Sequence, residues 1–512
     1  MRSFSTQLFY PSKSLHAAPW LRYAYGAAVI SAMAWGTALG YGIWPLGWGA
    51  FLPLWVIWMY APPAPSTALR LVVGPGLVVH AGAFLLAFPW IIHHASTTGV
   101  QAGLAAFGVL TLLYSLPLWA GGLLARRHRR FAGLAVWVGG WLLIDAAMQY
   151  GPWAFPWATA AHALIDSPGT PTLVRLGGPL AVTAALGTAH AIGWALLRAS
   201  TPIRIGGGTL VVVLLGVGLA GPAPAPSVSS DHTVWTVQPA LSPTTWAEAD
   251  RPDRRRHLEA LTRTALDTTA QRPDLIVWPE TALHPADTTG LQSFVTDTHI
   301  PLLSGAVAAT DSPGQVTNAT LLWRPNSHAV HRYDKHHLVP MVEYVPGMTQ
   351  WERLRLLQFA EDPERRYVRG PGPTTLTTET LRIGPLVCFE SLFGGYVARL
   401  PALTDIDVLV TVAQTGWWQQ SQPAHQHSRY SRLRAFETGR PLLIASVSGP
   451  STLIHPSGVL EQLASYNDAA VASAQLPTPE PPGLYVHRSI SIDIAWTAVG
   501  LLLVLGTIRR WF

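Results

Sequence analysis

Acidic residues are distributed very unevenly along this 512-residue chain, and this asymmetry constrains the fold more than any other feature. The first 221 residues contain only two carboxylates, Asp145 and Asp166, whereas the remaining 291 residues contain 26. Because a charge surrounded by lipid is costly, a long segment almost free of acids is typical of membrane-embedded helices. Charged residues make up only 12% of the chain, about half the share of an average soluble protein. The sequence therefore predicts two parts in different solvents, lipid first and water second.

Eight apolar runs are long enough to cross a bilayer as helices, which takes about 20 residues each. They lie at roughly 24–41, 45–61, 69–92, 102–125, 131–149, 174–197, 204–221 and 489–508. We therefore predict a polytopic α-helical membrane domain with seven transmembrane helices at 1–221. An extramembrane domain follows at 222–488, and one C-terminal transmembrane helix at 489–512.

Lysine and arginine residues occur in every second loop between these runs. They lie in the N-terminal tail, after the second, fourth and sixth runs, and at the C-terminal end: Arg2, Lys13, Arg22, Arg70, Arg126, Arg127, Arg129, Arg130, Arg198, Arg204, Arg509 and Arg510. The alternate loops near 42–44, 93–101 and 150–172 contain none. Because cytoplasmic loops carry the excess of Lys and Arg, we expect the N-terminus inside and residues 222–488 outside. The net charge of +6 includes no long basic tract, so no nucleic-acid partner is expected.

The polar part alternates short β-branched segments with helical segments. The predicted strands lie at 233–237, 275–278, 302–308, 319–323, 381–389, 406–412 and 442–447. Predicted helices at 254–270 and 425–438 fall between some of them. This alternation predicts a layered α/β or α+β domain with one sizeable core.

Three ionisable residues follow predicted strands in the polar domain: Glu280, Lys335 and Cys388. Cys388 is the only cysteine of the chain, and Lys335 is the only lysine outside the N-terminal tail, because arginine is used elsewhere. A thiolate attacks carbonyl carbon, a carboxylate moves the thiol proton, and an ammonium stabilises the resulting oxyanion. A lone buried cysteine is more often a small apolar side chain, but the joint occurrence of the three residues favours an acyl-transfer site.

The motifs around these residues resemble those of the nitrilase superfamily. The chain contains Trp-Pro-Glu at 278–280, then Lys335, then Cys-Phe-Glu at 388–390. Residues 337–346 read His-Leu-Val-Pro-Met-Val-Glu-Tyr-Val-Pro, close to the His-Leu-Val-Pro-Phe-Gly-Glu-Tyr-Val-Pro of the apolipoprotein N-acyltransferase family. With its flanking apolar runs, the chain resembles that family over nearly its whole length. The resemblance implies an αββα nitrilase-like sandwich attached to about eight transmembrane helices.

The resemblance also implies roles for individual residues. Glu280 would be the general base, Lys335 the oxyanion stabiliser and Cys388 the nucleophile, with Glu343 as a second acidic residue. Further residues match positions that line the family's active site: Trp246, Asn318, Glu390 and Trp417. Glu343 and Glu390 also have a purely structural interpretation, as buried or ion-paired carboxylates.

The implied reaction moves a fatty acyl chain from a phospholipid, chiefly phosphatidylethanolamine, to a lipoprotein. The acceptor would be the free α-amine of a diacylglyceryl-modified N-terminal cysteine on an apolipoprotein. We expect no cofactor and no metal, and a monomer in the bacterial inner membrane with its catalytic domain in the periplasm.

Two segments depart from the family pattern. Residues 414–418 read Gln-Thr-Gly-Trp-Trp in place of Asn-Asp-Ala-Trp-Phe, and residues 444–449 read Ile-Ala-Ser-Val-Ser-Gly in place of Arg-Ser-Thr-Asn-Asn-Gly. Phe389 also replaces the usual tyrosine. These changes leave three alternatives open: a diverged paralogue that acylates another amine, a membrane-anchored nitrilase-type amidase that uses water, and a scaffold protein with a relic domain.

Overall fold

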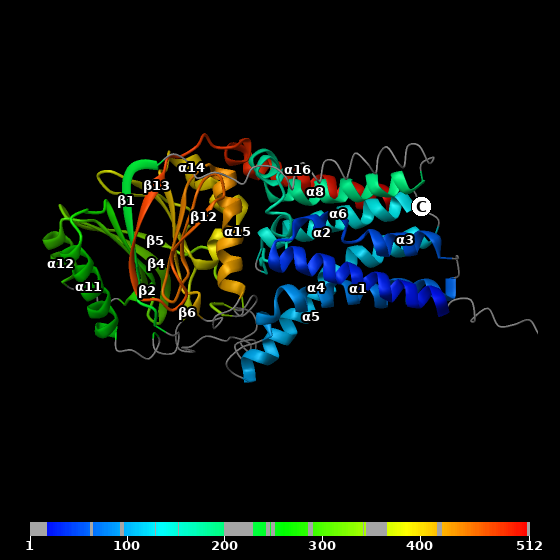
Figure 1. Cartoon of the computed structure of the whole chain (residues 1–512), viewed down its shortest axis with the longest axis horizontal. Coiled ribbons are helices and arrows are strands. Elements are labelled where there is room, and N and C mark those ends of the chain that lie inside the picture. Colours follow the sequence, from blue (N-terminus) through cyan, green and yellow to red (C-terminus); the bar gives the residue numbers. More distant parts are fainter. Residues whose placement is uncertain are drawn as a thin grey trace, which may run out of the picture.

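Two regions make up the molecule, a bundle of helices and a pair of β-sheets at one end of it (Figure 1). The computed structural model describes residues 18–61, 65–92, 97–127, 130–151, 153–198, 229–241, 246, 251–284, 290–340, 342–344, 366–416 and 422–508. The predicted transmembrane run at 204–221 and the site residue Trp417 lie outside these ranges.

The bundle is built from the apolar runs of the first 198 residues and from the last helix of the chain. Its helices are α1 (Ala18–Tyr41), α2 (Trp44–Gly49), α3 (Leu52–Tyr60), α4 (Pro65–Ala87), the 3-10 helix η1 (Pro89–Ile91), α5 (Thr97–Arg126), α6 (Arg130–Gln149), α7 (Ala160–Ala163), α8 (Thr170–Arg198) and α16 (Leu484–Ile508). Five stretches are long and apolar enough to cross a membrane: Ala68–Ala87, Gly103–Arg126, Phe131–Gln149, Thr170–Leu196 and Leu484–Thr507. They coincide with five of the eight predicted spans.

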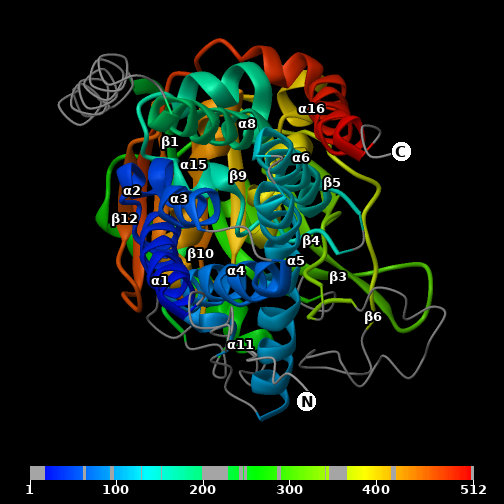
Figure 2. The ribbon, with the colours of Figure 1, turned by 90° about the vertical axis from the view of Figure 1, so that its right-hand side faces the viewer.

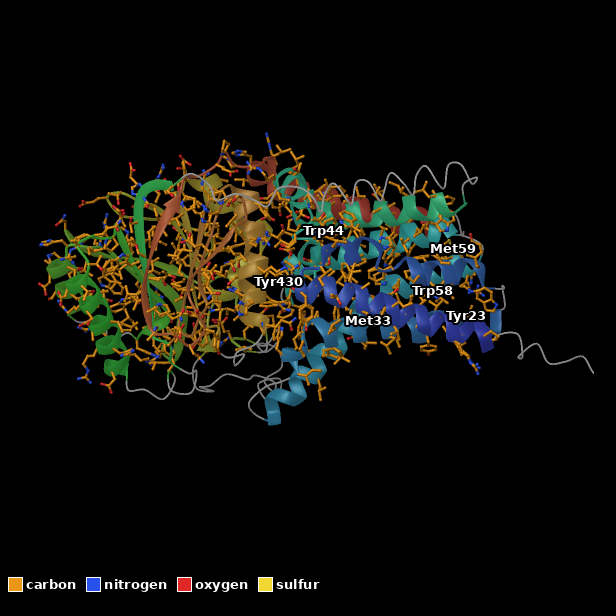
Figure 3. The ribbon with its side chains drawn as sticks, in the orientation of Figure 1. Tyr23, Met33, Trp44, Trp58, Met59 and Tyr430 are labelled. Atoms are coloured by element: carbon orange, nitrogen blue, oxygen red, sulfur yellow. The ribbon has the colours of Figure 1, made fainter. Side chains whose placement is uncertain are left out.

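The remaining described runs have a different form. The run at 45–61 is two short helices, α2 and α3, because Pro45 and Pro53 each lie in the first turn of a new helix. The run at 24–41 is part of α1, which packs along α4. Tyr23 and Met33 on α1 are 58% and 62% exposed (Figure 3), so apolar side chains cover part of the bundle surface.

The residues between α8 and α16 form two sheets. The first sheet contains β1 (Ser229–Gln238), β2 (Leu275–Leu283), β3 (Leu302–Ala309), β4 (Gln315–Arg324), β5 (Ser327–Asp334), β6 (Arg366–Tyr367) and β13 (Ala470–Pro477). The second contains β7 (Leu376–Thr377), β8 (Arg382–Val387), β9 (Val408–Ala413), β10 (Leu442–Ser446), β11 (Ser451–Ile454) and β12 (Leu460–Ala464). Their orders are β13-β1-β2-β3-β4-β5, with β6 beside β4, and β12-β11-β10-β9-β8-β7. The central strands β1, β2 and β3 are parallel, as are β8, β9 and β10.

The sheets pack face to face between two layers of helices. Strand β2 contacts β9 and β10 across the interior, and helices α11 (Arg251–Thr268) and α12 (Leu291–Thr298) pack on the first sheet. Helix α15 (Gln422–Thr438) packs on the second sheet and separates it from the bundle (Figure 1). The predicted αββα order is therefore confirmed. Strands buried on both faces are mostly apolar, as in β9, where all six residues are buried and only Thr411 is polar.

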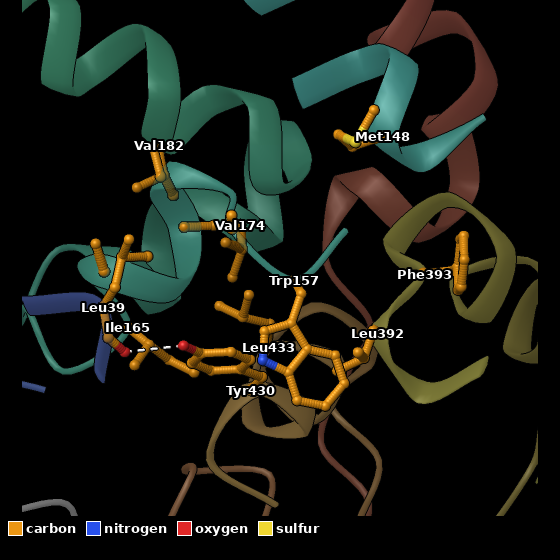
Figure 4. Close-up of a cluster of buried hydrophobic side chains, with 14 of the residues drawn as sticks. Leu39, Met148, Trp157, Ile165, Val174, Val182, Leu392, Phe393, Tyr430 and Leu433 are labelled. Carbon is orange, nitrogen blue, oxygen red and sulfur yellow. Dashed lines mark hydrogen bonds between the residues drawn. The ribbon is translucent and has the colours of Figure 1, made fainter. Parts of the chain in front are cut away.

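Helix α15 docks the sandwich onto the bundle. The Tyr430 hydroxyl donates a 2.8 Å hydrogen bond to the Leu39 carbonyl, and its ring stacks on His162 at 4.0 Å. Figure 4 shows Trp157 between Tyr430 and the apolar side chains around it. Arg429 donates a 3.0 Å hydrogen bond to Asp166. The aromatic segment after α6 therefore forms part of the contact surface between the bundle and the sandwich. The view from the bundle end shows the helices in front of the sheets (Figure 2).

Candidate active site

Glu280 lies on a bulge of β2 that aims it into the interior between the sheets. The pairing of β2 with β3 changes register between Trp278 and Leu283, because Pro279 has no N–H to donate to the ladder. Gly305 of β3 lies against this bulge, and a Cβ at that position would collide with the Pro279 carbonyl oxygen. The sequence Trp-Pro-Glu therefore directs the Glu280 carboxylate into the space between the sheets, where the residue is only 6% exposed.

Cys388 lies at the turn between β8 and the 3-10 helix η4 (Cys388–Leu392). Its φ of +49° is in the left-handed region, which is strained for a residue with a Cβ and is typical of functional turns. The Cys388 carbonyl oxygen is held at 3.0 Å by Nε2 of His427 and at 3.3 Å by Oγ of Ser391. The His427 contact fixes the turn from α15, and the Ser391 contact lies within η4 itself.

Lys335 follows β5 and lies between two carboxylates. Its Nζ is 2.9 Å from Oε1 of Glu343 and 3.8 Å from Oε1 of Glu280, and the residue is only 1% exposed. Asn318 of β4 donates from Nδ2 to the same two oxygens, at 2.7 Å to Glu280 and 3.1 Å to Glu343. Its carbonyl also accepts the backbone N–H of Lys335 at 2.8 Å. The Asn318 side chain therefore holds the two carboxylates, and its backbone carbonyl holds the main chain of Lys335 beside them.

Burial and charge act on the pKa values of these groups in different directions. Burial raises the pKa of Cys388 far above its ordinary value, and the negative charge of Glu280 raises it further. Burial also raises the pKa of Glu280, although the Lys335 ammonium opposes this shift. Burial disfavours the charge of Lys335, but Glu343 and Glu280 outweigh it and raise the pKa of the ammonium. The resting site thus holds a neutral thiol beside a charged lysine.

Glu390 is fully buried and connects the segment of Lys335 with the turn of Cys388. Its oxygens accept hydrogen bonds from the Tyr333 hydroxyl (2.6 Å) and from the backbone N–H groups of His336 (2.7 Å), His337 (3.0 Å) and Val387 (2.8 Å). Each bond joins residues next to one of the two reactive side chains. This geometry favours a positioning role for Glu390.

Among the remaining predicted residues, Trp246 lies next to the site. Its indole N–H donates to Oγ1 of Thr281 at 3.1 Å, the residue directly after Glu280. Two further groups contact the site and were not predicted from the sequence. The backbone N–H of Gln414 donates to Oε2 of Glu280 at 2.7 Å, and His427 holds the Cys388 carbonyl. No side-chain pattern marks a backbone N–H, and His427 falls inside a predicted helix with nothing to distinguish it.

Within the described residues, no group of three or more His, Cys, Asp or Glu side chains is placed to hold a metal ion. The three charged groups of the site form ion pairs with each other. The ionisable groups that the structure describes at the site are the thiol, the carboxylates and the ammonium.

The part of the chain that carries the two sheets and the site is similar to the carbon-nitrogen hydrolases, and it is joined to a bundle of apolar helices. The carbon-nitrogen hydrolase family model matches residues 236–478. A solved protein of that superfamily from Xanthomonas campestris aligns with 48% of this chain and 91% of its own, at 19% identity and a TM-score of 0.37.

Over most of its length the chain is similar to the apolipoprotein N-acyltransferases. The protein of that name from Rhizobium meliloti is 27% identical over 91% of this chain and 85% of its own length. That of Sinorhizobium fredii is 28% identical over the same shares, and that of Ralstonia nicotianae is 28% identical over 77% of each chain. The predicted resemblance to these enzymes, and the prediction of an acyltransferase in the carbon-nitrogen hydrolase superfamily, are confirmed.

Proposed function

We propose that this protein transfers a fatty acyl chain from a membrane phospholipid to the α-amine of a diacylglyceryl-cysteine apolipoprotein, through a thioester on Cys388. The observation that carries this proposal is the position of the nucleophile at the junction with the bundle. Phe389, directly after Cys388, stacks at 5.6 Å on Phe155 from the segment between α6 and α7. Because this thiol lies beside the apolar bundle, we infer that the acyl ester of a membrane lipid can reach it.

In the first half-reaction, the Cys388 sulfur attacks the ester carbonyl of the phospholipid while Glu280 accepts the thiol proton. The new alkoxide oxygen is stabilised by the Lys335 ammonium. Collapse of this intermediate expels the lysophospholipid oxygen, which takes the proton from Glu280. Because the net charge of two carboxylates and one ammonium disfavours a resting thiolate, proton transfer and attack belong to the same step.

In the second half-reaction, the acceptor amine attacks the thioester and gives its proton to Glu280. The intermediate collapses to the amide, and the Cys388 sulfur leaves and recovers the proton. Glu343 and Asn318 position Lys335 and Glu280 in both halves, as their hydrogen bonds of 2.9 and 2.7 Å to these groups support.

The enzyme acts as a monomer in the bacterial inner membrane, with eight spans and the catalytic domain in the periplasm. The alternation of basic and uncharged loops supports this orientation. Trp246 and Trp417 line the acyl or acceptor pocket. The contact of Trp246 with Thr281, beside Glu280, supports this role for Trp246.

The test is intact-mass analysis of purified protein incubated with phosphatidylethanolamine. The expected result is a single adduct of fatty-acyl mass that forms on wild type and is absent from Cys388→Ala. Addition of a diacylated lipopeptide with a free α-amine should discharge the adduct into the triacylated peptide. Rapid discharge by water alone would favour the amidase alternative, and the absence of any adduct with active-site protein would contradict the proposal.

A further inference from the structure

A cavity of about 330 Å³ lies where the sandwich meets the end of helix α6. Its walls include Tyr150 after α6, His336 and His337 directly after Lys335, and Arg369, Tyr396 and Arg399. It is about ten times the roughly 30 Å³ that one water molecule occupies in the liquid, so it has room for a small polar group.

The cavity has a strong excess of positive charge. Neither arginine has a carboxylate within ion-pair distance in the part of the chain that the structure describes, and no acidic residue lines the wall. The guanidinium of Arg369 lies over the ring of Tyr344 at 4.6 Å, and that of Arg399 lies over the ring of Tyr396 at 5.4 Å. The buried Nε of Arg399 has no hydrogen-bond partner. Aromatic rings orient these cations but do not neutralise them.

The carboxylate of Asp493 lies near the cavity behind Tyr150, and its buried Oδ1 has no hydrogen-bond partner. Its other oxygen, Oδ2, accepts hydrogen bonds from the hydroxyls of Tyr150 and Tyr485, and the carboxylate does not line the wall. The imidazole of His336 is held at 2.8 Å from the Gly370 carbonyl oxygen by Nδ1. The unpaired charge of the cavity therefore belongs to the two arginines.

The cavity is also placed at the level where lipid head groups lie. Tyr150 follows the last residue of the candidate span Phe131–Gln149, so the cavity begins at the end of a membrane-length helix. A wall of rings continues from it toward the nucleophile. His337 stacks on Phe393 at 3.9 Å, and Phe393 meets the edge of Phe389 at 5.0 Å, next to Cys388.

We propose that this cavity binds the phosphate of the phospholipid acyl donor, with Arg369 and Arg399 as its ligands. Arginine is the residue best suited to this role, because its planar donors match the oxygens of a phosphate group. In a glycerophospholipid the glycerol backbone joins the phosphate to the acyl esters, so a phosphate held here leaves an ester free to extend along the ring wall to Cys388. The inference rests on the proposed function, and it explains how that site selects a phospholipid over an uncharged acyl ester.

The test compares acyl donors and arginine variants by the rate at which Cys388 acquires an acyl adduct. Phosphatidylethanolamine and a diacylglycerol with the same acyl chains are titrated in detergent micelles against wild type, Arg369→Gln, Arg399→Gln, the double variant and Arg399→Lys. Arg272→Gln is the matched control, since Arg272 is exposed, lies on the far side of the sandwich after α11 and does not line the cavity.

Each single glutamine substitution is expected to raise the half-saturating concentration of phosphatidylethanolamine about tenfold, as for the loss of one charged hydrogen-bond donor. The maximal rate should stay within about threefold of wild type, and the diacylglycerol titration should not change. Arg399→Lys should recover part of the affinity, and Arg272→Gln should match wild type.

Three results would overturn the assignment, and they are distinguishable. Wild type that forms no adduct with any lipid contradicts the proposed function as well. If wild type forms the adduct and the double variant has an unchanged half-saturating concentration of phosphatidylethanolamine, the assignment of the cavity is rejected and the proposed function is not. If millimolar inorganic phosphate inhibits wild type but not the double variant, and the two proteins have the same lipid titration, the cavity binds a free anion and not the lipid.

Discussion

Substitution of Lys335 separates its structural charge from its proposed chemical role. Lys335→Met leaves Glu280 and Glu343 buried without their cation, and removal of one partner of a buried ion pair costs about 3–5 kcal/mol of folding free energy. Lys335→Arg keeps the charge, so most of this stability should remain. The guanidinium is wider and planar, and it cannot place a donor where Nζ now lies between the two carboxylates.

If Lys335 stabilises the oxyanion, both variants should therefore lose acylation. The loss of one oxyanion donor costs about 2.7–4 kcal/mol of transition-state stabilisation, or roughly 100- to 1000-fold in rate. The assay is the initial rate of Cys388 acylation by phosphatidylethanolamine at matched protein concentration, together with thermal unfolding in detergent. The double variant Lys335→Met/Glu343→Gln is the control, because it removes one excess carboxylate and should regain stability without regaining activity.

The decisive result is the arginine variant. A rate within a few-fold of wild type would show that only the charge matters and would refute the oxyanion role. A large loss of acylation rate with near-normal thermal unfolding would support this role. A purely structural cation would instead leave the rate of the arginine variant near that of wild type, because the charge is kept.

Three other predictions follow from the geometry of the site and the topology. Cys388→Ala and Cys388→Gly both lack the thiol and should be inactive. Because residue 388 has a φ of +49°, the glycine variant should be more stable than the alanine variant by about 1 kcal/mol in chemical unfolding; equal stability of the two variants would contradict the strained turn. Burial lowers the pKa of His427 from 6.5 to about 4, so the unfolded chain binds more protons between these values and stability falls as the pH falls through this window. The contribution is about 3 kcal/mol, and unfolding of His427→Gln should lack this part of the pH dependence; identical pH profiles would reject it. Reporter fusions near residues 230 and 480 should behave as external and those at 126–130 as cytoplasmic, and the reverse pattern would exclude a periplasmic site.

The membrane helices and the central strands were predictable because their signals are local. A run of about 20 apolar residues and a β-branched segment each report the solvent of their own residues. Strands such as β5 and β12 gave no such signal, because most of their residues are exposed or only half buried and show no apolar run. The division of the run at 45–61 into two short helices at Pro45 and Pro53 was not predicted for the opposite reason, because the residues around both prolines form one apolar run.

The sequence by itself predicted two parts in different solvents and three candidate reactive residues, Glu280, Lys335 and Cys388. Their scarcity and their positions at strand ends were visible without coordinates. Only the tertiary structure decided that Asn318 bridges two carboxylates, that Glu390 joins two loops and that unpaired arginines share one cavity. These relations depend on distances between segments far apart in the chain and on backbone N–H groups that every residue possesses. Local patterns cannot encode them, because packing alone brings such groups together.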